Sequence, residues 1–219
     1  MIIAEIGQNH MGDMNLAKLL IREAGDNGAD LVKFQLYNHN ILYKDRPDVP
    51  DVALSFEQAK MLFDYGEEVG IEVFFSVFDV EKVQWCEEIG VKKYKLAART
   101  IYDKDLQYEV GKTGKPVILS YHCTEHIPTM NIENHLYCIS DYPTKLESID
   151  FLMMESEYDG FSDHTVGFDA AKLALARGAK IIEKHFCIDH DTGIDAEWSM
   201  TPDELHELKG FEEICQQSL

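Results

Sequence analysis

Short apolar runs alternate with longer amphipathic stretches along the whole chain. An apolar run of about four to eight residues is typical of a buried strand, and an apolar residue at every third or fourth position is typical of a helix. Several helical stretches end at a glycine just before the next apolar run, as in "EVGIEVFF" and "TGKPVILS". The pattern predicts strands at 2–7, 30–36, 71–78, 93–98, 115–121, 135–140, 159–164 and 179–186. It predicts helices at 15–28, 55–69, 80–89, 103–113, 145–156, 168–178 and 202–216.

Strand–helix units that repeat along a chain are typical of a parallel sheet covered by helices. Eight strands with a helix after the last one predict a closed (β/α)8 TIM barrel of the α/β class, in which residues 1–219 form a single catalytic domain. A doubly wound open sheet is the alternative that the same repetition allows. Only "HCTEHIPTMNIEN" separates the fifth strand from the sixth, so we expect the fifth helix to be shortened or missing.

Polar residues on the predicted strands share one face and gather in the second half of each strand. Side chains alternate between two faces of a strand, so in "AKIIEKHF" Glu183 and His185 lie on one face and Lys184 on the other. In a barrel the polar face is the interior near the C-terminal mouth, where barrel enzymes keep their active sites. A lone inward polar residue is more often a satisfied core group, but here the placement recurs on six strands. Lys184, on the outer face, is expected to extend along the barrel wall to solvent.

Two histidines on this polar face predict a metal site. His164 and His185 end the seventh and eighth strands, which are neighbours in a barrel, so their imidazoles could bind one divalent ion. Glu183 could be a further ligand or could orient one of these histidines. A second, less favoured cluster for a soft metal is formed by His122, Cys123 and His126 in "SYHCTEH".

Two lysines on the polar face, Lys33 and Lys95, require anions if they are buried. A phosphate or carboxylate of a substrate would serve, and so would the internal carboxylates of Glu5 and Glu183; both explanations remain open here. Asp195, in the loop after the eighth strand, is expected to lie over the mouth of the barrel.

The composition and the motifs that are missing exclude several classes of function. A formal net charge of −20 argues against a nucleic-acid partner. The five cysteines contain no C-x-x-C pair, which is typical of reduced thiols in a cytoplasmic protein. The chain has no apolar run near the roughly 20 residues of a membrane span, and no basic region precedes its short apolar start, so a signal peptide is not expected. It also lacks a P-loop, a G-x-S-x-G elbow and a G-x-G-x-x-G loop, so NTPase, serine hydrolase and dinucleotide-binding functions have no support.

Seven motifs occur in a fixed order: "IIAEIGQNHMGDMNLAKLLI", "ADLVKFQ", "YKLA", "TGKPVILS", "YCISDYPT", "GFSDHTVGFDAA" and "GAKIIEKHF". In these motifs and in their order the chain resembles the N-acetylneuraminate (sialic acid) synthase family over almost its whole length. The resemblance implies a TIM barrel that condenses phosphoenolpyruvate with a sugar aldehyde, N-acetylmannosamine-like or a related aldose, to give a nonulosonic (sialic-type) acid and phosphate.

The resemblance also implies roles for individual residues. It places a divalent metal on His164 and His185, with Mn²⁺ as the first expectation and Mg²⁺, Co²⁺, Fe²⁺ or Zn²⁺ as alternatives. Around phosphoenolpyruvate it places Lys33, Lys95, Ser140 and Ser162. Near the reacting groups or the sugar it places Glu5, Gln35, Tyr142, Glu183 and Asp195.

The chain departs from the family pattern after the fourth strand. Ala98, Arg99 and Thr100 stand where the family has Ser-Gly-Glu, and Arg99 adds a permanent cation that could take over anion binding. The printed sequence ends at Leu219, where the family continues into an antifreeze-like domain that joins its dimers. A homo-oligomer of this chain is therefore expected to need another interface.

Two other functions remain open at this point. The altered residues would also suit a catalytically degenerate barrel that binds phosphoenolpyruvate or a sugar without turnover. A different metal-dependent barrel enzyme, such as an aldolase that forms a Schiff base on Lys95, is the third reading.

Overall fold

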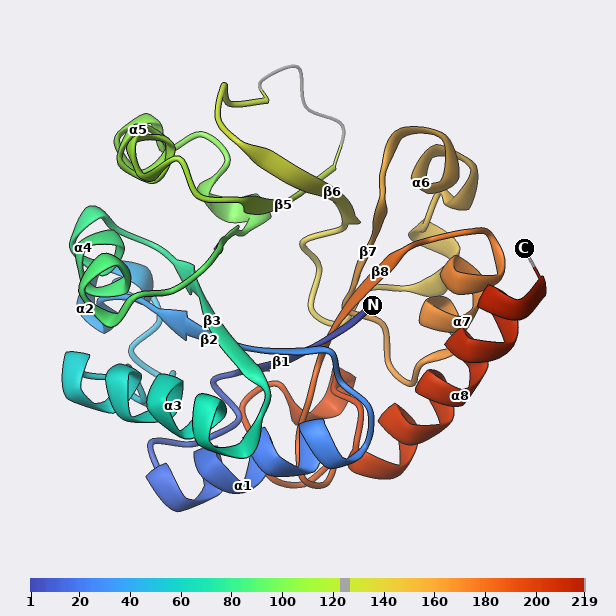
Figure 1. Ribbon diagram of the computed structural model, residues 1–219, viewed down its shortest axis with the longest axis horizontal. Helices are drawn as coiled ribbons and strands as arrows, with labels where there is room; N and C mark the ends of the chain where they lie inside the picture. Colours follow the sequence, from blue (N-terminus) through green and yellow to red (C-terminus); the bar gives the residue numbers. More distant parts are fainter. Residues whose placement is uncertain (123–126, 219) are drawn as a thin grey trace.

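The computed structural model describes residues 1–122 and 127–218, and it contains a closed barrel of parallel strands in the order β1 to β8 (Figure 1). The strands are β1 (Ile2–Gly7), β2 (Leu31–Leu36), β3 (Glu72–Val77), β4 (Tyr94–Leu96), β5 (Val117–Tyr121), β6 (Ile132–Cys138), β7 (Gly160–Asp163) and β8 (Ile181–His185). The helices are α1 (Met14–Asp26), α2 (His39–Leu42), α3 (Phe56–Val69), α4 (Val80–Ile89), α5 (Lys104–Thr113), α6 (Phe151–Glu157), α7 (Asp169–Ala176) and α8 (Pro202–Ser218). The TIM barrel is confirmed, and the open-sheet alternative is wrong because β1 pairs with β8 as well as with β2.

Element bounds differ from the predictions at a few places. The helix predicted at 145–156 begins only at Phe151, because the Asp150 side chain caps it by accepting bonds from the backbone N–H of Leu152 and Met153. The short helix α2 was not predicted. The sequence predicts that the helix after the fifth strand is shortened or missing. In agreement with this, residues 127–131, between β5 and β6, form no helix.

Local signals of the sequence set the helix ends that were predicted well. Helix α3 begins after Ser55, which forms a capping box with Gln58. The same helix ends at Gly70, whose φ of 83° lies in the left-handed region that side chains with a Cβ rarely adopt. Both signals are short-range, so the chain itself fixes where this helix starts and stops.

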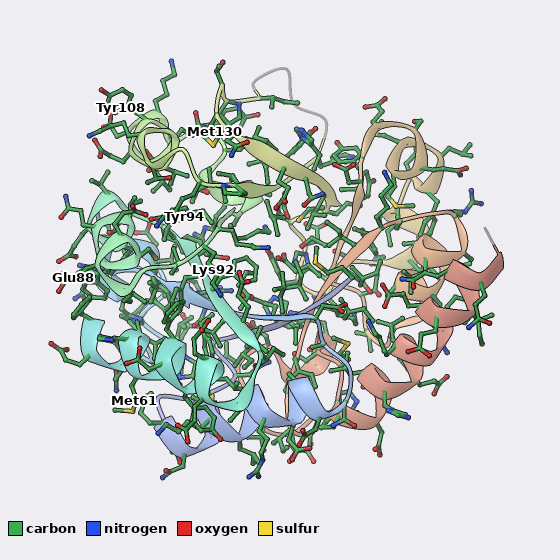
Figure 2. All side chains as sticks on the ribbon, viewed as in Figure 1. Met61, Glu88, Lys92, Tyr94, Tyr108 and Met130 are labelled. Atoms are coloured by element: carbon green, nitrogen blue, oxygen red, sulfur yellow. The ribbon has the colours of Figure 1, made fainter. Side chains whose placement is uncertain are left out.

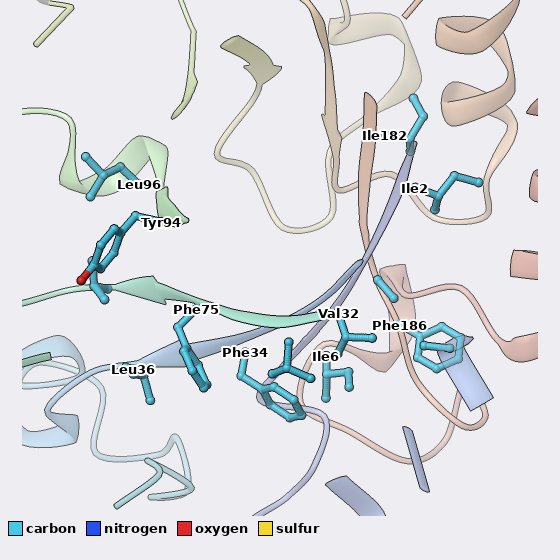
Figure 3. Packing of buried hydrophobic residues seen from close by; sticks show 14 of the residues in the cluster. Ile2, Ile6, Val32, Phe34, Leu36, Phe75, Tyr94, Leu96, Ile182 and Phe186 are labelled. Carbon is cyan, nitrogen blue, oxygen red and sulfur yellow. The ribbon is translucent and has the colours of Figure 1, made fainter. Parts of the chain in front are cut away.

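The apolar side chains form two separate layers. The larger one lies between the strands and the helices, and Figure 3 shows Ile6, Val32 and Phe34 gathered there on one side of β1 and β2. The exposed side chains Met61 and Tyr108 lie on the outer side of the helix ring (Figure 2). The smaller layer fills the barrel interior near the start of the strands, and its members are Ile3, Leu31, Phe74, Ile118, Leu136 and Ile181.

On six of the strands, the interior side chains change from apolar to mostly polar two residues further along. Glu5 follows Ile3 at this spacing, and Lys33 follows Leu31. The same step leads to Ser76, Ser120, Cys138 and Glu183 on β3, β5, β6 and β8. Because strand side chains alternate with period two, both layers lie on the same inner face. The apolar layer therefore fills the barrel on the side of the strand N-termini, and the polar layer lies next to it on the side of the strand C-termini.

The expectation that Lys184 reaches solvent is wrong. Its side chain is 0% exposed, and its Nζ donates to Asp163 Oδ2 at 2.9 Å and to the Thr165 carbonyl oxygen at 2.9 Å. Asp163 on β7 is the register partner of Lys184 on β8, so the neighbouring strand provides the carboxylate within the layer of helices. The buried pair joins the two strands directly before His164 and His185.

Among the helices in the described ranges, we find none whose length and apolar character would suffice to cross a membrane.

Candidate active site at the barrel mouth

A cavity of about 570 Å³ lies at the C-terminal ends of the strands. Strands β1, β2 and β4 to β8 contribute side chains to its floor and walls, together with the segments that follow β1, β2, β3, β4, β6, β7 and β8. The candidate residues that the sequence assigned to the barrel mouth all line it, namely Glu5, Lys33, Gln35, Lys95, Arg99, Ser140, Tyr142, Ser162, His164, Glu183, His185 and Asp195. The barrel thus brings to one place residues that are up to 190 positions apart in the sequence, from Glu5 to Asp195.

Four buried charged residues of alternating sign form the cavity floor; we call Glu5, Lys33, Glu183 and Lys95 the charged quartet. Lys33 Nζ lies 2.5 Å from Glu5 Oε2 and 3.7 Å from Glu183 Oε2. Lys95 Nζ lies 3.5 Å from Glu183 Oε1. The internal carboxylates therefore supply counter-ions for both lysines, which is one of the two explanations that the sequence left open.

Burial and the neighbouring charges act in opposite directions on the quartet. Burial raises the pKa of Glu5, and the ammonium of Lys33 offsets this rise only in part. For Glu183 burial also acts upward, but Lys33 and Lys95 together outweigh it and lower the pKa. Burial lowers the pKa of Lys95, whereas for Lys33 the carboxylates of Glu183 and Glu5 outweigh burial and raise it. Glu183 is thus the carboxyl group of the quartet that stays ionised, and Glu5 is the one more easily protonated.

Polar neighbours hold the quartet in place. Gln35 Nε2 donates to Glu5 Oε1 at 2.7 Å, and Ser162 Oγ donates to Glu183 Oε1 at 2.9 Å. Lys33 Nζ also donates to Ser76 Oγ at 2.6 Å. These bonds fix the carboxylates from the side, so their positions do not depend on the ion pairs alone.

The two predicted metal ligands lie side by side in the cavity wall, with ring centroids 5.6 Å apart. Burial lowers the pKa of His164 to about 4 and that of His185 well below its usual range, so both imidazoles are neutral, the form that binds metals. His164 Nδ1 lies 3.0 Å from the Ile139 carbonyl oxygen, which leaves its Nε2 for the cavity. His185 Nδ1 is buried without a hydrogen-bond partner among the described residues, although Asp195 Oδ2 lies 3.3 Å away.

These imidazoles fit a divalent ion as two of its ligands. Within residues 1–122 and 127–218 no group of three or more His, Cys, Asp or Glu side chains could hold a metal, so water or substrate would complete the coordination. The second cluster predicted from the sequence lies largely outside the described residues, which include His122 but neither Cys123 nor His126.

Aromatic rings form the wall next to the histidines. The Tyr142 ring packs on His164 with centroids 4.3 Å apart and on Trp198 at 5.9 Å. Burial raises the pKa of Asp195, on the same side of the cavity, to about 7, and the Glu5 carboxylate adds to this rise. This side therefore offers apolar ring faces and a carboxyl group that takes up a proton near neutral pH.

Sequence reasoning missed several residues of the cavity, including Gln8, Tyr43, Arg46, Ser120 and Trp198. Ser120 could have been found, because it follows Ile118 at the period of two that marks the floor. Tyr43, Arg46 and Trp198 lie outside the strands, where no periodic pattern indicates the direction of a side chain.

The altered segment after β4 forms a short 3₁₀ helix, Ala98–Thr100. Arg99 lines the cavity from this turn and is exposed at its rim. Thr100 is buried and donates its hydroxyl to the Ala97 carbonyl oxygen at 2.9 Å. With Ala-Arg-Thr in place of Ser-Gly-Glu, the segment therefore presents the cation of Arg99 to the cavity, whereas the Thr100 side chain is buried in the protein.

Comparisons with known proteins agree with this geometry. The model of the NeuB family matches residues 20–218. The chain is 31% identical to the N,N'-diacetyllegionaminic acid synthase of Campylobacter jejuni, over 95% of this chain and 74% of that protein. It is 30% identical to the human N-acetylneuraminate-9-phosphate synthase, over 100% and 70% of the two chains. The crystal structure of N-acetylneuraminic acid (sialic acid) synthetase from Leptospira borgpetersenii superposes with a TM-score of 0.92 at 32% identity, and the match covers 99% of this chain and 84% of that one. Since the family model matches most of the sequence and these relatives align over nearly all of it, the chain belongs to the NeuB family.

Proposed function

We propose that the protein condenses phosphoenolpyruvate with an aldose to give a nonulosonic acid and phosphate, with a divalent metal held by His164 and His185. The observation that carries the proposal is a single cavity in which a charged quartet adjoins two neutral imidazoles. The relatives named above, which are synthases of such sugar acids, support the same reaction.

The cations of the cavity account for binding of phosphoenolpyruvate, which carries a phosphate and a carboxylate. Lys33 and Lys95 are rigidly placed in the floor, and Arg99 extends from the rim. Ser140 and Ser162 add hydroxyl groups that can donate to anionic oxygens. An incoming anion competes with Glu183 for the two lysines, so binding exchanges an internal counter-ion for the substrate.

The reaction joins carbon three of phosphoenolpyruvate to the aldehyde carbon, adds water at carbon two and releases phosphate. The lysines stabilise the negative charge of the departing phosphate, and they hold the enol in line for attack. Glu5, whose pKa burial raises, is suited to transfer a proton in these steps. Tyr142, Gln35 and Asp195 line the same cavity, and we assign them to contacts with the sugar. A divalent ion, Mn²⁺ before Mg²⁺, Co²⁺, Fe²⁺ or Zn²⁺, would supply Lewis acidity toward the aldehyde oxygen.

Phosphate release tests the proposal. The protein, freed of metal and then supplied with one divalent ion at a time, is mixed with phosphoenolpyruvate and each of a panel of N-acylated and plain aldoses. We expect release that depends on both the metal and one class of aldose, together with a new keto acid detected by mass spectrometry. Calorimetric binding of phosphoenolpyruvate without release for any aldose would instead favour the degenerate barrel.

Replacing His185 with alanine tests the metal site separately. We expect the affinity for Mn²⁺, measured by calorimetry without substrates, to fall by at least about 100-fold, because one of two protein ligands is lost. His206→Ala on the outer surface is the matched control and should leave the affinity unchanged. Equal Mn²⁺ affinity in both variants would exclude His185 as a ligand.

A further inference from the structure

A buried amide in the loop after β1 holds the segment that follows β8. Asn9 Nδ2 donates to the Phe186 carbonyl oxygen and to Ser199 Oγ, each at 2.9 Å, and Asn9 Oδ1 accepts from the Asp195 backbone N–H at 2.8 Å. Ser199 Oγ in turn donates to the Asp195 carbonyl oxygen at 2.7 Å. Both backbone groups of Asp195 are thus bound within one network that starts at Asn9.

The held segment, residues 193–199, forms one wall of the cavity. Ile194, Asp195 and Trp198 line the cavity from it. The fit against Asn9 is close, since a Cβ placed on Gly193, whose φ is 132°, would lie 2.4 Å from Asn9 Oδ1. A side chain at position 193 would therefore push the segment away from the amide.

We propose that Asn9 is a positioning residue that fixes the 193–199 wall and thereby sets the affinity for the aldose rather than for phosphoenolpyruvate, an inference that rests on the function proposed above. Asn9 is almost fully buried and does not line the cavity, so it acts through Asp195 and Trp198. Its amide satisfies two acceptors and one donor, which few other side chains of this size can do.

The separation of the two substrates follows from the layout of the barrel. The 193–199 wall lies against the histidine side, where Asp195 Oδ2 is 3.3 Å from His185 Nδ1 and the Trp198 ring is 5.9 Å from that of Tyr142. The lysines proposed to bind phosphoenolpyruvate come from β2 and β4. They are held by the quartet, which makes no use of Asn9.

Asn9→Ala tests the proposal with two kinds of readout. Without substrates, we expect exchange of the Asp195 amide hydrogen to be faster by at least about tenfold, because its acceptor is lost. The only two tryptophans are Trp85 and Trp198, so in a Trp85→Phe background quenching by acrylamide reports Trp198 alone and should increase. In turnover, KM for the aldose should rise about tenfold while KM for phosphoenolpyruvate stays within about twofold.

Asn27→Ala is the matched control, because it also removes a donating amide, from the Glu23 carbonyl oxygen at the end of α1. It should change none of these readouts. If Asn9→Ala does not fold, Ser199→Ala removes two bonds of the same network with little loss of volume. It keeps the acceptor of the Asp195 N–H on Asn9, so smaller shifts in the same direction are expected.

The outcomes separate the inference from the proposed function. Unchanged exchange and quenching would overturn the positioning role, whether or not the protein condenses the two substrates. A looser segment with both KM values raised equally would overturn the assignment to the aldose. An inactive wild-type protein would count against the proposed function and also against the aldose assignment, while exchange would still decide whether Asn9 holds the wall.

Discussion

Replacing Lys184 with methionine is expected to lower the free energy of unfolding by about 3–5 kcal/mol, because it leaves a buried carboxylate without its counter-ion. In the wild-type protein Lys184 Nζ contacts Asp163 Oδ2 and the Thr165 carbonyl oxygen, and both side chains of the pair are 0% exposed. Asp163 Oδ1 would keep its bond from the Thr165 backbone N–H at 2.8 Å, which compensates only in part. Equilibrium unfolding in urea, monitored by circular dichroism, measures the change.

A double-mutant cycle attributes the loss to the pair. In Asp163→Asn/Lys184→Met the buried charge is gone, so the double variant should be more stable than the sum of the single changes predicts. Lys60→Met is the control, since it breaks an exposed pair with Asp64 on α3 and should change stability far less. A loss below about 1 kcal/mol in Lys184→Met would mean that water or a shifted side chain solvates Asp163.

The inner polar layer could be predicted from the sequences of the individual strands. Period two places Glu5 two residues after Ile3 and Glu183 two residues after Ile181, and each assignment needs only the residues of its own strand. The barrel then adds convergence, because the C-terminal ends of parallel strands meet at one mouth. For this reason the fold and the floor of the cavity could be predicted before any contact was known.

Lys184 shows where this reasoning stops. Parity placed it correctly on the outer face, but its partner depends on the register between two strands, Asp163 opposite Lys184, which a single strand does not contain. The residues of the cavity walls could not be predicted for a second reason. Tyr43 and Trp198 are held by hydrogen bonds and ring contacts of irregular segments. The sequence there has no period, so only the folded chain defines which side chains face the cavity.

Lys95→Met is expected to lower kcat/KM of the proposed condensation by about 10³-fold, because it removes a fixed cation from the place where phosphate develops charge. Lys95 is almost fully buried, and its Nζ lies 3.5 Å from Glu183 Oε1 and 3.3 Å from the Leu96 carbonyl oxygen. Lys93→Met is the matched control, two residues earlier on the same chain segment, where the lysine lies 3.9 Å from Glu72 and does not line the cavity. It should alter kcat/KM by no more than about twofold, and steady-state phosphate release measures both variants.

Lys95→Arg distinguishes an electrostatic role of this lysine from a covalent one. Burial lowers the pKa of Lys95, which would also suit an amine that attacks a carbonyl, as in a Schiff-base aldolase. A guanidinium keeps the charge but cannot form the imine, so we expect Lys95→Arg to retain more activity than Lys95→Met. Borohydride added during turnover should then leave the mass of the wild-type protein unchanged. A substrate-derived mass on Lys95, together with equal inactivity of the two variants, would replace the condensation mechanism with the aldolase one.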